Sequence, residues 1–177
     1  MKKLICTLIL IIGLAPAFAQ ESTKADDITT LIFVRHAEKL DDGTKDPSLN
    51  EKGVMRAEKL SDLLQQNYDL KAIYSTGYRR TLETSTPISK KTGLEINQYG
   101  LSNPDSLIND IIELHKGQQV LIMGHSNTTP NLVNTALGKQ TFDQLDESEY
   151  DNIFEVKIDA AGNATVKRYK YWTQGRE

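Results

Sequence analysis

The chain has 177 residues, with 24 acidic and 21 basic side chains and a net charge of −3. This length suits one domain with a hydrophobic core. An acidic protein is a poor binder of nucleic acid or of an anionic membrane surface, so we expect neither as a partner. A site for an anionic substrate would therefore depend on arginine side chains gathered in one place.

Residues 1–19 are typical of a secretory signal peptide. Two lysines precede an apolar run over residues 4–14, and Ala-Phe-Ala at residues 17–19 supplies a small-x-small cleavage pattern. The apolar run is shorter than the roughly 20 residues that a membrane-spanning helix needs. We therefore expect cleavage before Gln20, export to the periplasm or the medium, and a single domain over residues 20–177 that leaves the membrane.

Cleavage would leave 158 residues and would remove two lysines, so that the net charge falls from −3 to −5. Cys6, the one cysteine of the chain, would be removed as well. The mature protein is therefore expected to fold without disulfides and to have no thiol chemistry.

Apolar runs and turn residues predict alternating strands and helices along the mature chain. The expected strands cover residues 28–34, 71–75, 94–96, 119–123, 153–158 and 164–171. The expected helices cover residues 51–66, 79–91, 104–116 and 129–137. Thr129 and Pro130 have the residue types of an N-cap and a first helical position.

Strands that alternate with helices favour parallel βαβ units. The predicted fold is therefore an α/β three-layer sandwich, with a mostly parallel sheet covered by helices on both faces. Ligands of such sheets bind beyond the carboxyl ends of the strands. Three polar clusters are expected there: Arg35-His36, Arg79-Arg80 and His125-Ser126-Asn127.

These residue types suit phosphate chemistry. Arginine presents a planar, permanently charged fork for phosphate, and histidine can act as a nucleophile that divides hydrolysis into two easier steps. A cleft with Arg35, His36, Arg80 and His125 would stabilise a transferring phosphoryl group without a metal ion. The helix expected to begin near residue 129 would add the positive end of its dipole.

Three blocks of sequence resemble the histidine phosphatase superfamily (branch 1), whose fold is also called phosphoglycerate-mutase-like. They are residues 31–39 (LIFVRHAEK), 74–84 (YSTGYRRTLET) and 120–127 (VLIMGHSN). The segment LNEKG at residues 49–53, followed by Arg56-Ala57, resembles the helix lead-in of that family. The blocks occur in the family's order and at its spacings, which makes the resemblance much more specific than any single block.

The resemblance implies a role for each matching residue. His36 would accept the phosphoryl group, and Arg35, Arg80 and His125 would hold it. The chain departs from the family at Ala37, where glycine is usual, so that the local backbone geometry beside the nucleophile is an open question.

The resemblance also implies a carboxylic acid between the second and third blocks that protonates the leaving group. Asp105, at the start of a predicted helix, is the candidate, and Glu38 is the next. Glu38 and Asn127 are also candidates for substrate binding. Specificity is expected to depend on the loops at residues 39–50, 97–106 and 138–150.

The predicted function is that of a metal-independent phosphatase of the histidine acid phosphatase type, without cofactors. Its substrate would be a phosphorylated small molecule or a phosphoprotein. A non-catalytic phosphate-binding module on the same fold and a phosphomutase are the alternatives. A serine hydrolase is disfavoured because no histidine follows His125, and the spacing of His36, His115 and His125 resembles no zinc motif.

Overall fold

The computed structural model describes residues 28–172. The predicted signal peptide lies outside the described residues and stays a prediction. The strands are β1 (Thr29–Arg35), β2 (Leu70–Thr76), β3 (Ile96–Tyr99), β4 (Gln119–Gly124), β5 (Asn152–Ile158) and β6 (Ala164–Lys170). The helices are α1 (Glu51–Asn67), α2 (Arg79–Thr92), α3 (Pro104–Leu114) and α4 (Thr128–Leu137).

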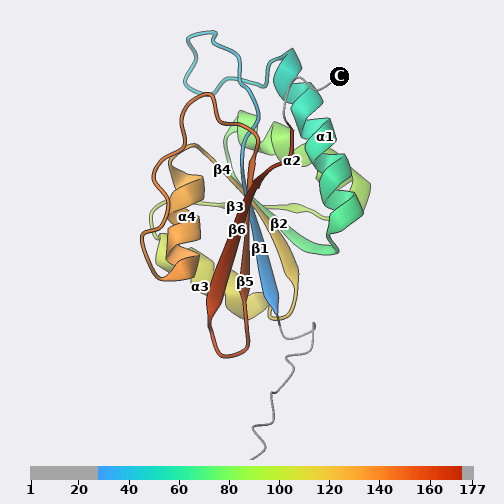
Figure 1. Cartoon of the computed structure of the whole chain (residues 1–177). Coiled ribbons are helices and arrows are strands. Elements are labelled where there is room, and N and C mark those ends of the chain that lie inside the picture. The colour runs from blue at the N-terminus through green and yellow to red at the C-terminus, as the bar shows by residue number, and fades with distance from the viewer. Residues whose placement is uncertain (1–27, 173–177) are drawn as a thin grey trace, which may run out of the picture.

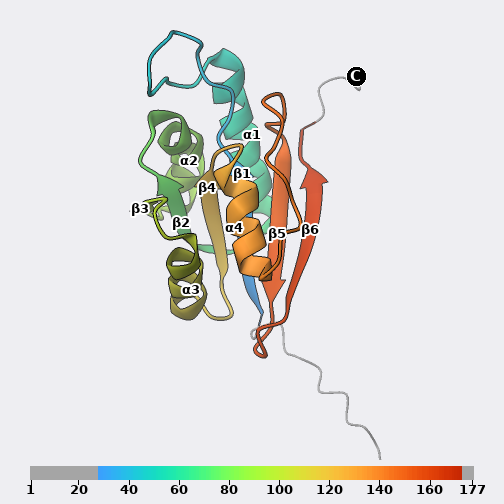
Figure 2. The same ribbon diagram turned by 90° about the vertical axis from the view of Figure 1, so that its left-hand side faces the viewer.

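The six strands form one sheet in the order β3-β2-β4-β1-β5-β6. The strands β3, β2, β4 and β1 are parallel, β5 is antiparallel to β1, and β6 is antiparallel to β5. Helices α1 and α2 cover one face of the sheet, while α3 and α4 cover the other (Figures 1 and 2). The predicted three-layer α/β sandwich is confirmed, and the carboxyl ends of the four parallel strands lie at one edge.

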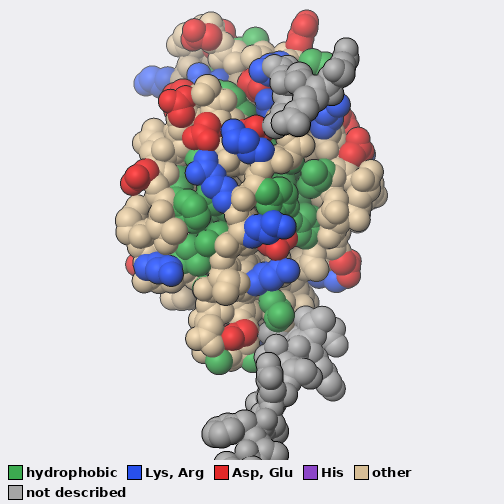
Figure 3. Space-filling model, in the orientation of Figure 1, with side chains coloured by type: hydrophobic (Ala, Val, Ile, Leu, Met, Phe, Trp, Pro, Cys, Tyr) green, Lys and Arg blue, Asp and Glu red, His purple; other side chains and the backbone are tan. Residues whose placement is uncertain are grey.

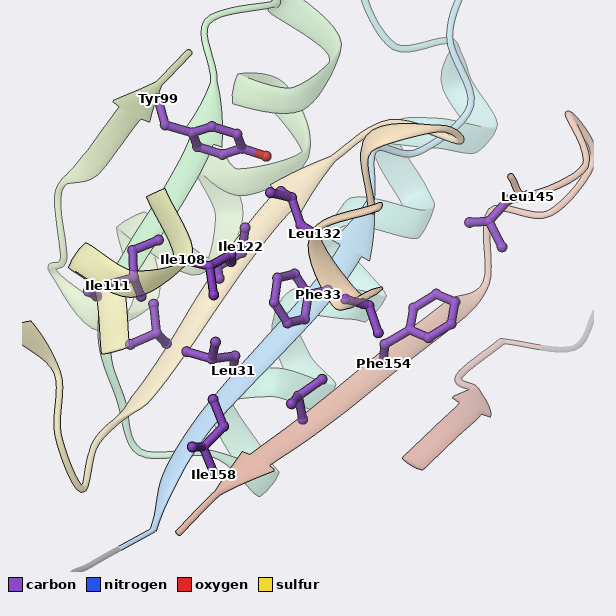
Figure 4. Packing of buried hydrophobic residues seen from close by; sticks show 14 residues of the cluster. Leu31, Phe33, Tyr99, Ile108, Ile111, Ile122, Leu132, Leu145, Phe154 and Ile158 are labelled. Atoms are coloured by element: carbon purple, nitrogen blue, oxygen red, sulfur yellow. The ribbon is translucent and has the colours of Figure 1, made fainter. Parts of the chain in front are cut away.

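The central strand β1 divides the hydrophobic core into two halves. Leu31 and Phe33 belong to the cluster under α3 and α4, part of which is drawn in Figure 4. Ile32 and Val34 point to the opposite face and pack under α1 and α2. Every residue of β1 is buried, so this strand holds the residues at its carboxyl end in a rigid setting.

Strand β6 lies at the open edge of the sheet. Its exposed side chains include Lys167, Arg168 and Lys170, and Figure 3 shows basic side chains spread over this face of the molecule. Charges on an edge strand discourage pairing with a second sheet. Within residues 28–172, none of the helices combines the length and the apolar character needed to cross a membrane.

The structure corrects one predicted strand. The segment predicted at residues 94–96 pairs with β2 only from Ile96 onward, and the strand continues to Tyr99. Leu94 is apolar because it packs against the cluster under α1 and α2. Tyr99 is the one buried residue of β3, and its hydroxyl donates to the carbonyl of Met123 at 2.9 Å. An edge strand with one buried position gives little alternating pattern to detect.

The structure also corrects the predicted start of the last helix. The N-cap is Asn127, whose side chain accepts from the Thr128 backbone N–H, so that the helix begins at Thr128. Thr129 lies inside the first turn and is buried against the end of β4. Thr129 and Pro130 are therefore helical residues, and the N-cap of α4 lies two residues closer to His125 than predicted.

Helix α1 approaches the segment after β1 closely. A Cβ atom added to Gly53 would lie 2.1 Å from the backbone oxygen of Glu38. The same oxygen accepts the backbone N–H of Asn50 at 3.0 Å, and the Asn50 side chain caps the helix. Gly53 therefore sets the distance between α1 and the segment that follows His36.

We expect Gly53→Ala to destabilise the protein by about 1–3 kcal/mol, the usual cost of overpacking. Urea unfolding would measure the change. Gly100→Ala is the matched control, because a Cβ there meets no atom within 4 Å. Equal stability of the two variants would show that the close approach of α1 is not required.

Candidate active site

A cavity of about 310 Å³ lies at the carboxyl edge of the sheet. Arg35, His36, Arg80 and His125 are all among the residues that line it. The backbone N–H of His36 donates to the Gly124 carbonyl at 2.9 Å, which extends the pairing of β1 with β4 by one residue. The structure therefore brings together the four residues that the sequence predicted at this edge.

His36 is held in one tautomer. Its Nδ1 lies 2.7 Å from the carbonyl oxygen of Ala37, and a carbonyl oxygen can only accept, so Nδ1 carries the proton. The other ring nitrogen, Nε2, accepts from Arg80 Nε at 3.3 Å. A neutral His36 thus presents the lone pair of Nε2 toward a guanidinium.

His125 lies beside His36, with ring centroids 5.3 Å apart. Its Nδ1 lies 3.3 Å from an Arg80 nitrogen that can only donate, so the proton is on Nε2. That Nε2 donates to the Thr76 hydroxyl at 3.0 Å, and Thr76 in turn contacts the Thr81 hydroxyl at 2.9 Å. This chain of hydroxyls fixes the orientation of the His125 ring.

Both histidines are neutral in the free protein. Burial lowers the pKa of His36 to about 3, and the charges of Arg35 and Arg80 act in the same direction. Burial also lowers the pKa of His125 to about 4, and the charge of Arg80 adds to the effect. The lone pair of His36 Nε2 is therefore available as a nucleophile well below neutral pH.

Arg35 is a buried cation held mainly by backbone oxygens. Its side chain is 2% exposed, and one nitrogen donates to the carbonyls of Asp146, Glu147 and Glu149 at 2.8 to 3.3 Å. The ring of Tyr150 lies 4.1 Å from the guanidinium carbon. Among the described residues, Arg35 Nε has no hydrogen-bond partner, which leaves one donor of this cation free for an anion.

Arg80, and not its neighbour Arg79, enters the cavity. The Arg80 side chain is 15% exposed and contacts both histidines. The Arg79 side chain is 63% exposed and pairs with Glu83 at 3.8 Å. Asp46 lies 3.4 Å from Arg80 and accepts the backbone N–H of Arg79, so it is a positioning group for the start of α2.

Ala37 fits without backbone strain. No residue other than glycine has a positive φ in the part of the chain that the structure describes. The Ala37 side chain is fully buried in a small cluster with Leu49 and Ala57, and its backbone N–H donates to the Thr84 hydroxyl at 3.0 Å. The methyl group therefore fills space behind the nucleophile.

Two predicted site residues do not line the cavity, whereas Asn127 does. Both carboxylate oxygens of Glu38 accept from Arg56 at 2.7 Å. Burial alone would raise the pKa of Glu38, but the hydrogen bonds from Arg56 and Lys52 outweigh it and lower the pKa. Asp105 is exposed in the first turn of α3.

Several cavity residues were not named from the sequence. Lys39, Tyr78, Leu101 and Glu147 line the cavity. A carboxylate oxygen of Glu147 lies 2.7 Å from Arg35 and the other accepts from the Ser126 hydroxyl at 2.9 Å. Lys39, Leu101 and Glu147 come from the three loops expected to determine specificity, but no local pattern marks them.

The three histidines do not form a metal site. His115 caps the carboxyl end of α3, where its ring contacts Tyr74 and Gln118. Among the described residues, no group of three or more His, Cys, Asp or Glu side chains is arranged to hold a metal ion.

Comparison with known proteins is consistent with this geometry. Residues 31–99 match the model described as histidine phosphatase superfamily (branch 1). The match includes the first two blocks, and the fold brings the third block, residues 120–127, beside them. No curated protein matches the sequence.

Several solved structures share the fold. The protein histidine phosphatase SixA, complexed with tungstate, is 15% identical, with a TM-score of 0.65 over 80% of this chain and 97% of that one. Phosphoserine phosphatase from Entamoeba histolytica is 16% identical, with a TM-score of 0.63 over 82% and 98%. YhfR from Bacillus stearothermophilus is 21% identical, with a TM-score of 0.62 over 78% and 95%.

The fold is thus the phosphoglycerate-mutase-like α/β fold, with paired histidines and arginines at the carboxyl edge of the sheet. Over residues 31–99 the chain is similar to the histidine phosphatase superfamily (branch 1).

We expect the rings of His36 and His125 to stay neutral at pH 5. Because burial lowers both pKa values, protonation should occur only as the pH falls toward 4 for His125 and 3 for His36. Long-range proton–nitrogen NMR spectra of the imidazole rings would measure this, with His36→Ala and His125→Ala to assign the signals. Titration of either ring near its ordinary value of about 6.5 would contradict the account.

Proposed function

We propose that the protein is a metal-independent phosphatase that hydrolyses phosphate monoesters through a phosphohistidine on His36. The observation that carries the proposal is the His36 ring. Its Nδ1 proton is held by the Ala37 carbonyl, so the Nε2 lone pair faces a cavity with two guanidinium groups. A neutral nucleophile beside fixed positive charge suits attack on an anionic phosphoryl group.

In the first step, His36 Nε2 forms a bond to phosphorus as the bond from phosphorus to the leaving oxygen breaks. Arg35 and Arg80 neutralise charge on the transferring group. His125 donates to it from Nδ1 in its other neutral tautomer, in which Nε2 accepts from the Thr76 hydroxyl. In the second step, water attacks phosphorus and gives a proton to the carboxylate that protonated the leaving oxygen, while the bond to Nε2 breaks. Phosphate is released, and the neutral histidine and the carboxylic acid are regenerated.

His36→Ala is expected to lower the turnover of p-nitrophenyl phosphate by about 10⁴-fold or more, as removal of a nucleophile does elsewhere. His115→Ala is the matched control, since His115 lies outside the cavity. Wild-type turnover should persist in EDTA. Robust activity of His36→Ala, or loss in EDTA with recovery on adding zinc, would contradict the proposal.

Arg80→Ala is expected to lower kcat/KM by roughly 10²–10³, the cost of removing one charge-stabilising contact. His125→Ala should have a similar effect. Arg79→Ala should cost far less, because that side chain points to solvent and a glutamate. A larger loss of kcat/KM for Arg79→Ala than for Arg80→Ala would contradict this assignment. It would mean that Arg79, and not Arg80, is the arginine of the second block that holds the phosphoryl group.

Two carboxyl groups are candidates for the proton donor to the leaving oxygen. Asp105 is the sequence prediction, but it does not line the cavity. Glu147 does, and in the free protein its pKa is lowered, because the hydrogen bond from Ser126 and the charge of Arg35 outweigh the effect of burial. A bound phosphate dianion would raise that pKa by repulsion. We therefore propose Glu147 first and Asp105 second.

The two candidates can be distinguished by comparing substrates with different leaving groups. Glu147→Gln should slow alkyl phosphates by roughly 10²–10⁴ and barely slow p-nitrophenyl phosphate, whose leaving group needs little protonation. Asp105→Asn should slow neither selectively. The opposite pattern in kcat/KM would assign the proton to Asp105 and leave Glu147 as a partner of Arg35.

A further inference from the structure

The mouth of the cavity differs from one side to the other. Tyr78 follows β2 and Leu101 follows β3, so both lie toward the β3 end of the sheet order. Lys39 follows β1 and Glu147 precedes β5, so both lie toward the β5 end. The apolar side chains of the mouth therefore lie toward the β3 end, beside Arg80, and the charged pair lies toward the β5 end. His36 and the polar residues that follow β4 (Ser126, Asn127 and Thr128) lie between them.

The apolar side is exposed although both residues are large. Tyr78 is 41% exposed and Leu101 is 44% exposed. Single exposed apolar residues are ordinary on a protein surface. These two come from separate loops and line one cavity, which is the arrangement that a shared apolar ligand would require.

The Tyr78 ring is held in place from within the site. The Arg80 guanidinium carbon lies 4.5 Å from the ring centroid, and the His125 ring meets it edge-on at 5.1 Å. A ring fixed in this way loses little conformational freedom when a ligand packs against it. Tyr78 therefore links the groups proposed to hold the phosphoryl group to the surface on which a leaving group would lie.

We infer that the leaving group of the substrate is aromatic, and that its ring packs against Tyr78 and Leu101 while the phosphoryl group lies between His36 and the arginines. The inference rests on the proposed function. Aromatic rings pair favourably with centroids about 4.5–7 Å apart. The substrate class is an aryl phosphate, free or as part of a larger molecule.

Phosphonates test this independently of turnover, because their carbon–phosphorus bond resists the proposed hydrolysis. Phenylphosphonate, methylphosphonate and 2-aminoethylphosphonate would be titrated calorimetrically into the wild-type protein. Phenylphosphonate should bind about tenfold or more tightly than methylphosphonate, the discrimination expected of a hydrophobic contact. Leu101→Ser should remove most of that preference, and Leu114→Ser, on the exposed face of α3, should keep it.

Each outcome decides the inference. Equal binding of phenyl- and methylphosphonate, or tightest binding of 2-aminoethylphosphonate on the charged side, would overturn it. A phenyl preference that survives Leu101→Ser would overturn it as well, and so would a failure of all three probes to bind. A phenyl preference lost in Leu101→Ser, in a protein that hydrolyses no phosphate ester, would support the aromatic surface and reject the phosphatase.

Discussion

The burial of Arg35 at the carboxyl end of β1 is the constraint around which the site is built. A guanidinium cannot be neutralised by losing a proton, so burial requires partners in the protein. The loop that leads into β5 supplies three backbone carbonyls and the Glu147 carboxylate, and Tyr150 covers one face of the cation. Because β5 pairs with β1, this loop is returned to the site by the antiparallel part of the sheet.

Burial of the two histidine rings beside these arginines determines their protonation state. Desolvation and the nearby guanidinium charges disfavour imidazolium, so both rings are neutral and each presents one lone pair to Arg80. The protons are held by the Ala37 carbonyl and the Thr76 hydroxyl. A fixed, neutral nucleophile and a fixed positive field are thus two consequences of one buried cluster, and neither needs reorganisation when an anion binds.

Apolar runs and helical periodicity were sufficient to predict the layers. Strands β1 and β4 are nearly continuous apolar segments, and the helices carry apolar residues at helical spacing. The same reasoning predicted that Arg35, His36, Arg80 and His125 meet. Each lies at or soon after the carboxyl end of a strand, and these strands are parallel neighbours. This reasoning missed Glu147, Tyr78 and Leu101, whose proximity depends on the paths of irregular loops. Glu38 was predicted to bind substrate, but its carboxylate is occupied by Arg56. The sequence does not show this contact, because it depends on the close packing of α1 at Gly53. The position of Tyr78 directly before two arginines was the one sign in the sequence of the apolar side of the mouth.

The central claim is that His36 carries the phosphoryl group during turnover. The direct test is rapid-quench mixing of the wild-type protein with a phosphate ester, followed at alkaline pH by mass-spectrometric mapping of the phosphorylated peptide. The account predicts a phosphoryl group on His36 that is stable in alkali, labile in acid and lost as product phosphate forms. Phosphate released in a single turnover with no phosphoryl group on His36 at any time, or with one on Ser126 instead, would contradict it.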